Sequence, residues 1–144
     1  MSPDIKADVV RWKYWVQFSP GTFDIIAASP PCTEYSRALT TRPRQLQKAD
    51  RIIRKVLQLI KWLAPKMWWI ENPRWGLLRD RPMMKHLWYV DIDYCMISHY
   101  GYQKLTRFWV PKEVASRLAP VVCDGWCENM VEEDGRWHHR VRLG

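Results

Sequence analysis

Apolar and polar positions along this chain are grouped in a way that predicts alternating strands and helices. Residues 23–28 form a short run, apolar except for Asp24, that stops at a Pro-Pro pair, which is typical of a buried strand in a parallel sheet. Residues 67–70 form a second run of the same kind. Between them, the apolar positions of residues 44–63 recur at helical spacing, Lys and Arg occupy the other face, and Pro65 follows. The pattern predicts a strand, a helix and a second strand.

The rest of the chain extends this pattern. Residues 32–43 are polar and predict a long surface loop, a feature that is usually functional or mobile in a compact domain. A short helix is expected over residues 81–87, and strands over residues 90–98 and 107–110. This order of elements predicts an α/β fold built on an open, mostly parallel sheet with helices on its faces.

Reactive side chains follow both apolar runs. Cys32 comes directly after Pro30-Pro31, and Glu71 comes directly after the second run. Because parallel strands end at one edge of a sheet, a thiol and a carboxylate placed there indicate a nucleophile and an acid acting on one small substrate. Arg37 and Arg42 in the polar loop, with Arg44 just after it, favour a thiolate, and burial of Glu71 favours a protonated carboxyl that can donate. The simpler alternatives are an inert buried Cys and a Glu paired with Arg74 or capping a helix.

The positive charge of the chain is concentrated. The formal net charge is +8, and residues 37–81 hold 12 Lys and Arg against three acids. This segment joins the two candidate site residues, and such a patch favours binding of a polyanion, most often nucleic acid. The alternative is a solvated helix face that keeps the protein in solution.

Composition limits the class of protein. With 144 residues, of which 47% are apolar, including ten Trp, the chain is expected to fold as one domain. It has no apolar run of about 18 residues and no apolar segment at its N-terminus, so we expect no membrane span and no secretion. The four cysteines then indicate reduced thiols of a soluble intracellular protein, in cytoplasm or nucleus.

Together these residues resemble the DNA cytosine carbon-5 methyltransferases. Pro31-Cys32 matches the family's Pro-Cys loop, Ser36 matches its loop serine, and Glu71-Asn72-Pro73 matches its Glu-Asn-Val or Glu-Asn-Pro tripeptide. Residues 101–107 resemble the family's Gln-x-Arg-x-Arg block or a Lys-Pro-Thr variant of it. Three departures are Thr33, Tyr35 and Leu105, which stand where the family usually has Gln, Phe and Arg.

The resemblance implies a role for each matching residue. Cys32 would add to the cytosine ring, and Glu71 would hold ring N3 and the exocyclic amine. Arg107, with Lys104 as a possible participant, would bind the carbonyl oxygen. DNA is the implied partner, S-adenosylmethionine the implied methyl donor, and the target base would be flipped out of the duplex. The expected substrate-binding residues are Pro31, Ser36, Arg37, Asn72, Gln103, Lys104 and Thr106.

The family's Gly-rich cofactor turn has no counterpart among the six glycines. Asp8 resembles the later acid that contacts the adenine amine, so the chain is expected to begin there and to form a partial, Rossmann-like methyltransferase domain over residues 1–111. Residues 112–144 would be a short extension that acts as a reduced target-recognition element. The chain would then be a fragment, a half completed by a second chain that carries the cofactor site, or a degenerate copy.

Two other functions are weighed. Ser29-Pro30-Pro31 resembles the Ser-Pro-Pro-Tyr of amino-group methyltransferases, but that interpretation leaves Glu71-Asn72-Pro73 unexplained. A basic nucleic-acid-binding module would use the positive patch, with aromatic side chains stacking on bases, but leaves Cys32 and Glu71 unexplained. The stacking candidates would be Trp12, Trp15 and Trp75.

The C-terminal segment contains a small group of metal-ligand types. Cys123 and Cys127 lie four positions apart, and His138-His139 follow. Adjacent histidines are poor ligand spacing, so the pattern favours a plain loop or hairpin and no metal, with Cys123, Cys127 and His138 as the ligands if zinc binds.

Overall fold

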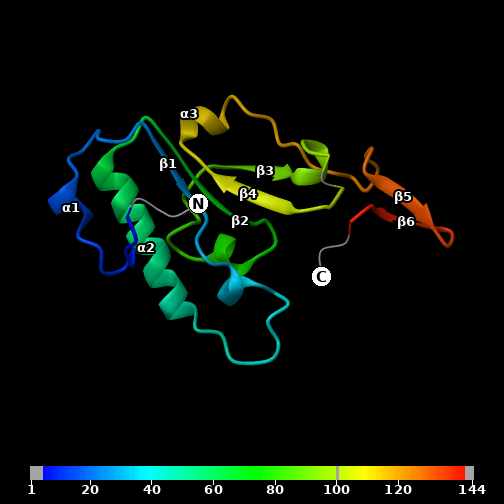
Figure 1. The fold of residues 1–144 in the computed structure, drawn as a ribbon, viewed down its shortest axis with the longest axis horizontal. Coiled ribbons are helices and arrows are strands. Elements are labelled where there is room, and N and C mark those ends of the chain that lie inside the picture. Colours follow the sequence, from blue (N-terminus) through cyan, green and yellow to red (C-terminus); the bar gives the residue numbers. More distant parts are fainter. Residues whose placement is uncertain (1–4, 100, 142–144) are drawn as a thin grey trace.

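The structure, a computed structural model, describes residues 5–99 and 101–141. It contains α-helices, short 3-10 helices (η) and two sheets (Figure 1). The helical elements are α1 (Tyr14–Gln17), η1 (Thr33–Tyr35), α2 (Leu46–Leu63), η2 (Leu77–Asp80), η3 (Tyr94–Met96) and α3 (Lys112–Ala115). The strands are β1 (Ile25–Ala28), β2 (Met67–Pro73), β3 (Tyr89–Asp93), β4 (Leu105–Trp109), β5 (Met130–Glu133) and β6 (Arg136–His139).

The main sheet is mixed, and most of its pairings are antiparallel. Its strand order is β1-β2-β4-β3, with β1 parallel to β2 and β4 antiparallel to both of its neighbours. The α/β class is confirmed, but the expectation of a mostly parallel sheet is wrong. A parallel pairing needs a long crossover, which α2 supplies once. Between β2 and β4 the described residues form only β3, short 3-10 helices and turns, and β3 returns through η3 into its antiparallel neighbour β4.

Two further sequence expectations need correction between β2 and β4. Residues 81–87 form successive turns in place of a helix, with Met84 N–H bonded to Arg81 O and Leu87 N–H to Met84 O. Pro82 has no N–H to offer, and Arg81 is drawn into an ion pair with the buried Asp50. The strand expected over residues 90–98 ends at Asp93, where η3 begins.

The expected long helix is confirmed, and it builds the core. Its apolar face packs on one face of the main sheet, where it meets Ile70 of β2 and Trp109 of β4 (Figure 1). The helix stops at Ala64, whose φ of 46° is left-handed, just before Pro65. The helix residues in this core are Ala49, Ile53, Val56 and Ile60. This packing holds the β1–β2 pair, and with it both candidate site segments, on a rigid support.

The C-terminal part of the chain forms a separate hairpin. Strands β5 and β6 pair antiparallel around Asp134-Gly135, both of which have positive φ, as a tight Asp-Gly hairpin turn requires. The hairpin lies at the far end of the molecule from α1 (Figure 1). Within the described part of the chain, no helix is both long and apolar enough to cross a membrane.

Candidate active site

The structure brings the Pro-Pro-Cys segment and the Glu-Asn-Pro segment to one edge of the main sheet. Because β1 and β2 are parallel, with Ala28 opposite Ile70, the chain leaves β1 beside the Glu71-Asn72-Pro73 segment, which continues β2 and pairs with β4. The buried Asn72 side chain joins them, since its Nδ2 donates to the Pro30 carbonyl oxygen at 2.8 Å. Asn72 therefore helps to position the Cys32 loop, because Cys32 lies two residues after Pro30, whose carbonyl oxygen accepts the hydrogen bond.

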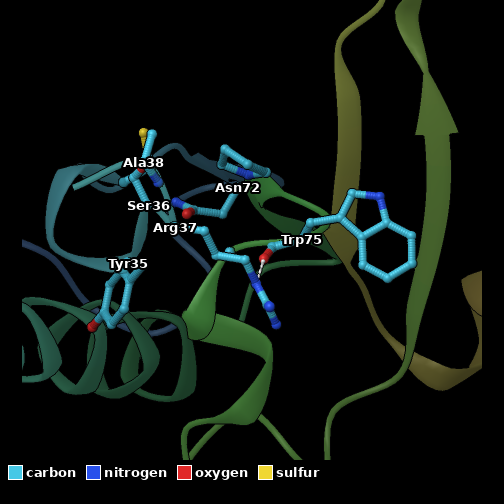
Figure 2. A pocket seen from close by; sticks show the side chains of 9 residues that line it. Tyr35, Ser36, Arg37, Ala38, Asn72 and Trp75 are labelled. Carbon is cyan, nitrogen blue, oxygen red and sulfur yellow. Dashed lines mark hydrogen bonds between the residues drawn. The ribbon is translucent and has the colours of Figure 1, made fainter. Parts of the chain in front are cut away.

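Cys32 is exposed and lines a small pocket beside this junction. The pocket has a volume of about 240 Å³, below the roughly 300–1,000 Å³ of sites for drug-sized ligands. Ser36, Arg37 and Trp75 also line it, together with Asn72 (Figure 2). A pocket of this size suits a single flat base. Glu71 is not among the residues that line it.

Hydrogen bonds fold the loop after Cys32 back onto the protein. Arg37 Nε donates to the Trp75 carbonyl oxygen at 2.8 Å, as Figure 2 shows, and Arg44 donates to the Ser36 carbonyl oxygen at 2.7 Å. Arg37 thus forms part of the wall of the pocket, and Arg44 holds the loop from behind it.

A second set of contacts closes the base of the loop. Arg42 pairs with Glu34, and the other Glu34 oxygen accepts the Gln45 N–H at 2.7 Å. The Arg42 hydrogen bond, followed by that from the Gln45 backbone, lowers the pKa of Glu34 to about 2. The ionised Glu34 carboxylate, near the start of the loop, thus binds Arg42 and Gln45 near its end.

A buried polar network anchors the same loop to α2. Tyr35 Oη donates to Asp50 Oδ1 at 2.9 Å, and Arg81 Nε donates to that oxygen at 3.0 Å. Burial opposes ionisation of Asp50, but these hydrogen bonds outweigh it and lower its pKa. Burial, followed by the Asp50 contact, raises the pKa of Tyr35. Tyr35 points away from the pocket and toward the helix (Figure 2). Its role is to hold the loop in place.

Lys104 is the cation at Glu71. Its Nζ lies 2.9 Å from Glu71 Oε1, and the two side chains are 35% and 13% exposed. Burial opposes the charge of Lys104, but the contact with Glu71 outweighs it and raises the Lys104 pKa. The ammonium also lies 4.8 Å from the centre of the Tyr94 ring. The structure therefore places one carboxylate and one ammonium together at the edge of the sheet that carries Cys32.

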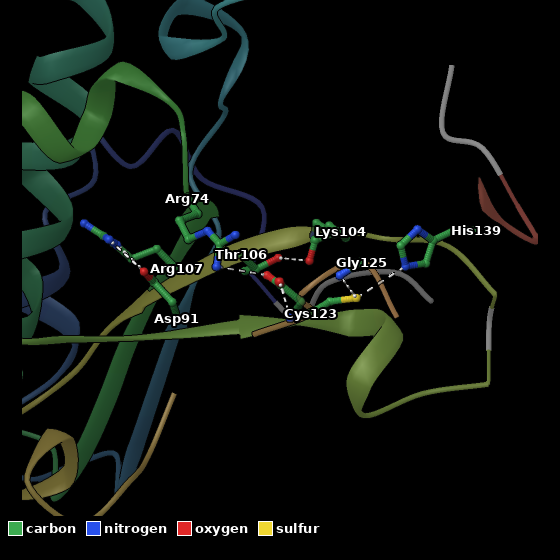
Figure 3. Close-up of polar contacts among 9 residues, drawn as sticks. Arg74, Asp91, Lys104, Thr106, Arg107, Cys123, Gly125 and His139 are labelled. Carbon is green, nitrogen blue, oxygen red and sulfur yellow. Dashed lines mark hydrogen bonds and ion pairs between the residues drawn. The ribbon is translucent and has the colours of Figure 1, made fainter. Parts of the chain in front are cut away.

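Arg107, which was expected to bind substrate, is engaged elsewhere. Its guanidinium makes two hydrogen bonds to Asp91, of 2.7 and 2.8 Å, and lies 3.5 Å from the centre of the Tyr89 ring (Figure 3). Residues directly opposite in a sheet share a face, so Arg107 lies on the Asn72 face while Glu71 lies on the other. The structure does not bring Arg107 to Glu71, because the side-chain alternation of β4 turns it away.

Three other expected site residues also lie apart from the Cys32 pocket. Gln103 lines a different hollow, which faces the β5–β6 hairpin. Thr106 is fully buried, and its hydroxyl donates to the Lys104 carbonyl oxygen. Asp8, the expected cofactor ligand, is exposed, and its carboxylate accepts the Val10 N–H at 2.9 Å.

Trp75 is a site residue that the sequence indicated only as one of several stacking candidates. It is 51% exposed, and the guanidinium groups of Arg74 and Arg79 lie 5.2 and 5.1 Å from the ring centre. An exposed indole beside a pocket is suited to stacking on a nucleotide base.

The C-terminal cysteines lie in a loop followed by a hairpin, as expected, but His139 and not His138 lies beside them. His139 Nε2 lies 3.7 Å from Cys123 Sγ and 3.5 Å from Cys127 Sγ. Cys95 joins these three residues. His138 contacts Glu133 and the Val131 carbonyl oxygen instead, because adjacent residues of a strand face opposite sides. The sequence did not reveal Cys95, which lies 28 positions before Cys123 with β4 between them.

A thiol loop and a carboxylate tripeptide at one edge of a mixed α/β sheet are the arrangement that the resemblance to the methyltransferases implies. No family model matches the chain. It is 32% identical over 152 residues to the probable DNA (cytosine-5)-methyltransferase of Frog virus 3 (isolate Goorha), a match that covers 94% of this chain and 69% of the relative. The chain belongs to the DNA (cytosine-5)-methyltransferase family.

Proposed function

We propose that this chain carries the base-handling half of a DNA cytosine carbon-5 methyltransferase, with residues 1–111 as its partial catalytic domain. The observation that carries the proposal is the Asn72–Pro30 hydrogen bond, which sets the Cys32 loop against the Glu71 segment. The exposed thiol, a base-sized pocket and an ion-paired carboxylate lie around this junction. The name of the Frog virus 3 relative supports the reaction class.

Cys32 is the nucleophile in this proposal. Its thiolate adds to carbon 6 of cytosine, the carbon–sulfur bond forms, and the electron pair of the 5,6 double bond moves into the ring. Carbon 5 is then part of an electron-rich enamine. Glu71 shares a proton with ring N3 and neutralises the charge that develops there.

Lys104 takes the role that the resemblance assigned to Arg107. Its ammonium lies 2.9 Å from Glu71 Oε1 and is partly exposed, so it can hydrogen-bond the carbonyl oxygen of a base held by that carboxylate. Arg107 is committed to Asp91 on the other face of the sheet. This choice agrees with the Lys-x-Thr pattern of residues 104–106.

The family implies S-adenosylmethionine as the methyl donor, but the described residues do not fit a site for it. The Asp8 carboxylate is turned back onto the Val10 N–H and lies 3.9 Å from Arg11 Nε, and its side chain is 59% exposed. No step of this proposal therefore passes through the cofactor.

A second polypeptide is proposed to complete the cofactor half. Strand β1 is at the edge of the main sheet, with one neighbour among the described strands, and Ile25 on it is 58% exposed. An apolar, unpaired strand edge is a surface that proteins normally cover. A strand added there would extend the sheet on the side where β1 leads to Cys32.

Hydrogen exchange at carbon 5 tests the base-handling step without the methyl donor. The enamine takes a proton from water at carbon 5, loses the original hydrogen and expels the thiolate, so the cytosine is restored. With duplex DNA that carries tritium at this position, the chain is expected to release tritium to water. Cys32→Ser and Glu71→Gln should abolish release or lower it at least about 100-fold, whereas Glu113→Gln, an exposed control, should not change it.

Tritium release that survives Cys32→Ser would contradict the mechanism. If release fails in the wild-type chain while DNA binding, measured by fluorescence anisotropy, is intact, a catalytically degenerate binding module is correct instead. Release without transfer of a labelled methyl group from S-adenosylmethionine would separate the base-handling half from a complete enzyme.

One observation favours the binding module as the second candidate. Trp75 is 51% exposed beside the Cys32 pocket, and an exposed indole can stack on a base without any chemistry. On this reading, Trp75→Ala lowers DNA affinity and Cys32→Ser does not. Only the exchange experiment distinguishes the two candidates.

A further inference from the structure

Four side chains of metal-ligating type converge at the far end of the main sheet from α1. The thiols of Cys95, Cys123 and Cys127 and a ring nitrogen of His139 all lie within 4.8 Å of one another. They come from three separate segments: η3 after β3, the loop before the hairpin, and β6. Cys95 and Cys123 are buried, and the other two are partly buried.

The spacing of these atoms is that of a tetrahedral site. With Zn–S bonds of ~2.3 Å and Zn–N bonds of ~2.0–2.1 Å, a tetrahedron separates a sulfur from a nitrogen by about 3.6 Å. His139 Nε2 lies 3.7 and 3.5 Å from the sulfurs of Cys123 and Cys127 (the first of these contacts is shown in Figure 3). Three thiols and an imidazole are a soft ligand set that suits Zn²⁺.

The surrounding backbone holds these ligands in place. Gly125 N–H points at Cys123 Sγ, 3.4 Å away, and the Gly125 φ of 98° is one that other residues rarely adopt. The buried Asp93 carboxylate accepts the Cys123 N–H at 2.9 Å. The buried Asn129 side chain donates to the Cys95 carbonyl oxygen at 2.7 Å. Such outer contacts orient metal ligands and the loops that carry them.

Among the described residues, the contacts that tie the β5–β6 hairpin to the main sheet lie at its two ends: the Val141 N–H donates to the Gly101 carbonyl oxygen at 2.7 Å, and the Asn129 side chain donates to the Cys95 carbonyl oxygen. None of its eight residues is buried, and Trp137 on it is 51% exposed. An isolated two-stranded hairpin is marginal in water. A metal that joins Cys95 of the main sheet to His139 of the hairpin would supply a further constraint, as zinc does in small domains that lack a core.

We propose that Cys95, Cys123, Cys127 and His139 bind one structural Zn²⁺ that fixes the C-terminal hairpin to the end of β3. All four positions are filled by protein ligands, which is the mark of a structural rather than a catalytic zinc. The zinc ligand Cys95 directly follows Tyr94, whose ring contacts Lys104 of the proposed active site. The proposal does not depend on methyltransferase activity.

The metal content of the full chain tests this proposal. The protein, produced with zinc in the medium and freed of any affinity tag, is dialysed and analysed by mass spectrometry of metals. One zinc per chain is expected. Cys127→Ser and His139→Asn should lose the metal on dialysis. The matched controls His138→Asn and Cys32→Ser should keep it, since His138 is the adjacent histidine and Cys32 lies outside the cluster.

Two measurements on the wild-type chain remain decisive if a ligand variant does not fold. Co²⁺ added to the chelator-treated protein should give thiolate charge-transfer bands and the intense visible bands of a tetrahedral ion. Chelation should lower the Tm, and Zn²⁺ should restore it. A wild-type chain without zinc, an octahedral Co²⁺ spectrum, iron in place of zinc, or a disulfide between these cysteines would each overturn the proposal.

Discussion

Asn72 Nδ2 donates a hydrogen bond of 2.8 Å to the carbonyl oxygen of Pro30. This bond joins residues 42 positions apart and lies between the two chemical groups of the site, next to Glu71 on one strand and two residues before Cys32 on the other. Because Asn72 is 1% exposed, water does not compete for the contact. The side chain therefore sets the position of the nucleophile loop relative to the carboxylate.

Replacement of this amide should impair chemistry more than binding. In Asn72→Asp a carboxylate faces the Pro30 carbonyl oxygen, and the two acceptors repel each other. A displacement of the loop by about 1 Å can lower a rate about 100-fold. We expect a loss of this size in tritium release from carbon 5 at saturating DNA.

The matched control is Gln47→Glu, which makes the same change of amide to carboxylate at an exposed position of α2. Both variants lower the net charge by one, so their DNA affinities should fall by similar small factors. Equal rates for the two variants would show that the Asn72 contact has no positioning role.

Loss of the Lys104 charge should lower the rate of tritium release, whereas loss of the Arg107 charge should lower the stability of the fold. Lys104→Met removes the ammonium at Glu71 and is expected to lower tritium release about 100-fold, as loss of one charge-stabilising donor does. Arg107→Met leaves Asp91, which is 15% exposed, without its partner. This should lower the free energy of unfolding by about 3 kcal/mol.

Urea unfolding and tritium release, measured on both variants, distinguish these roles. The opposite result, with a stable Arg107→Met that releases no tritium and an active Lys104→Met, would return the carbonyl contact to Arg107.

Asp50 binds both Tyr35 of the Cys32 loop and Arg81, so replacement of Arg81 should lower the stability of the fold that holds this loop. In Arg81→Met, Asp50, which is 2% exposed, loses the guanidinium that pairs with it, and we expect a loss of about 3 kcal/mol in the free energy of unfolding. Arg54 is the matched control, because it approaches the same carboxylate at 4.0 Å but is 60% exposed. Arg54→Met should change stability by less than about 1 kcal/mol. Similar losses in the two variants would rule out a special role for the buried pair.

The loop closure at Glu34 should depend on pH. Its folded pKa of about 2 lies below the ordinary value of 4.5, so its stabilising effect is complete above about pH 4.5 and is lost as the pH falls through 2. Titration of the Glu34 carboxyl carbon by NMR should give this low pKa in the wild-type chain. Arg42→Gln should raise the Glu34 pKa, because it removes the hydrogen bond from Arg42 that is the largest cause of the lowered value. An ordinary pKa in the wild-type chain would mean that the ion pair does not form in solution.

Elements with strong local patterns could be predicted from the sequence. The helix α2 was predicted over residues 44–63 because the apolar positions there recur at helical spacing and Pro65 ends the pattern. The apolar runs at 23–28 and 67–70 were predicted as strands, and they form the parallel pair β1 and β2. The direction of β4 could not be predicted, because strand direction depends on connections and not on strand composition. The helix expected over residues 81–87 is absent from the structure. Arg81 there pairs with Asp50 of α2, a tertiary contact that the local sequence does not reveal.

The site was predicted in part. Cys32 and Glu71 stand at the ends of apolar runs, and parallel pairing brings such ends together. Arg107 was assigned from a motif, but the alternation of side chains along β4 places it on the far face, where Asp91 binds it. The same alternation selects His139 over His138, and no local spacing connects Cys95 with Cys123.

The sequence by itself determined the order of the chemical groups that this protein carries: a thiol after one apolar run, a carboxylate after the next, and a basic helix between them. These follow from residue order and local periodicity, which need no folded chain. Tertiary structure alone decided that Asn72 bonds to Pro30, that Lys104 rather than Arg107 meets Glu71, and that Cys95 joins the C-terminal cluster. Each of these depends on which face of a strand a side chain occupies and which distant segment packs there, and a shift of one residue would reverse it.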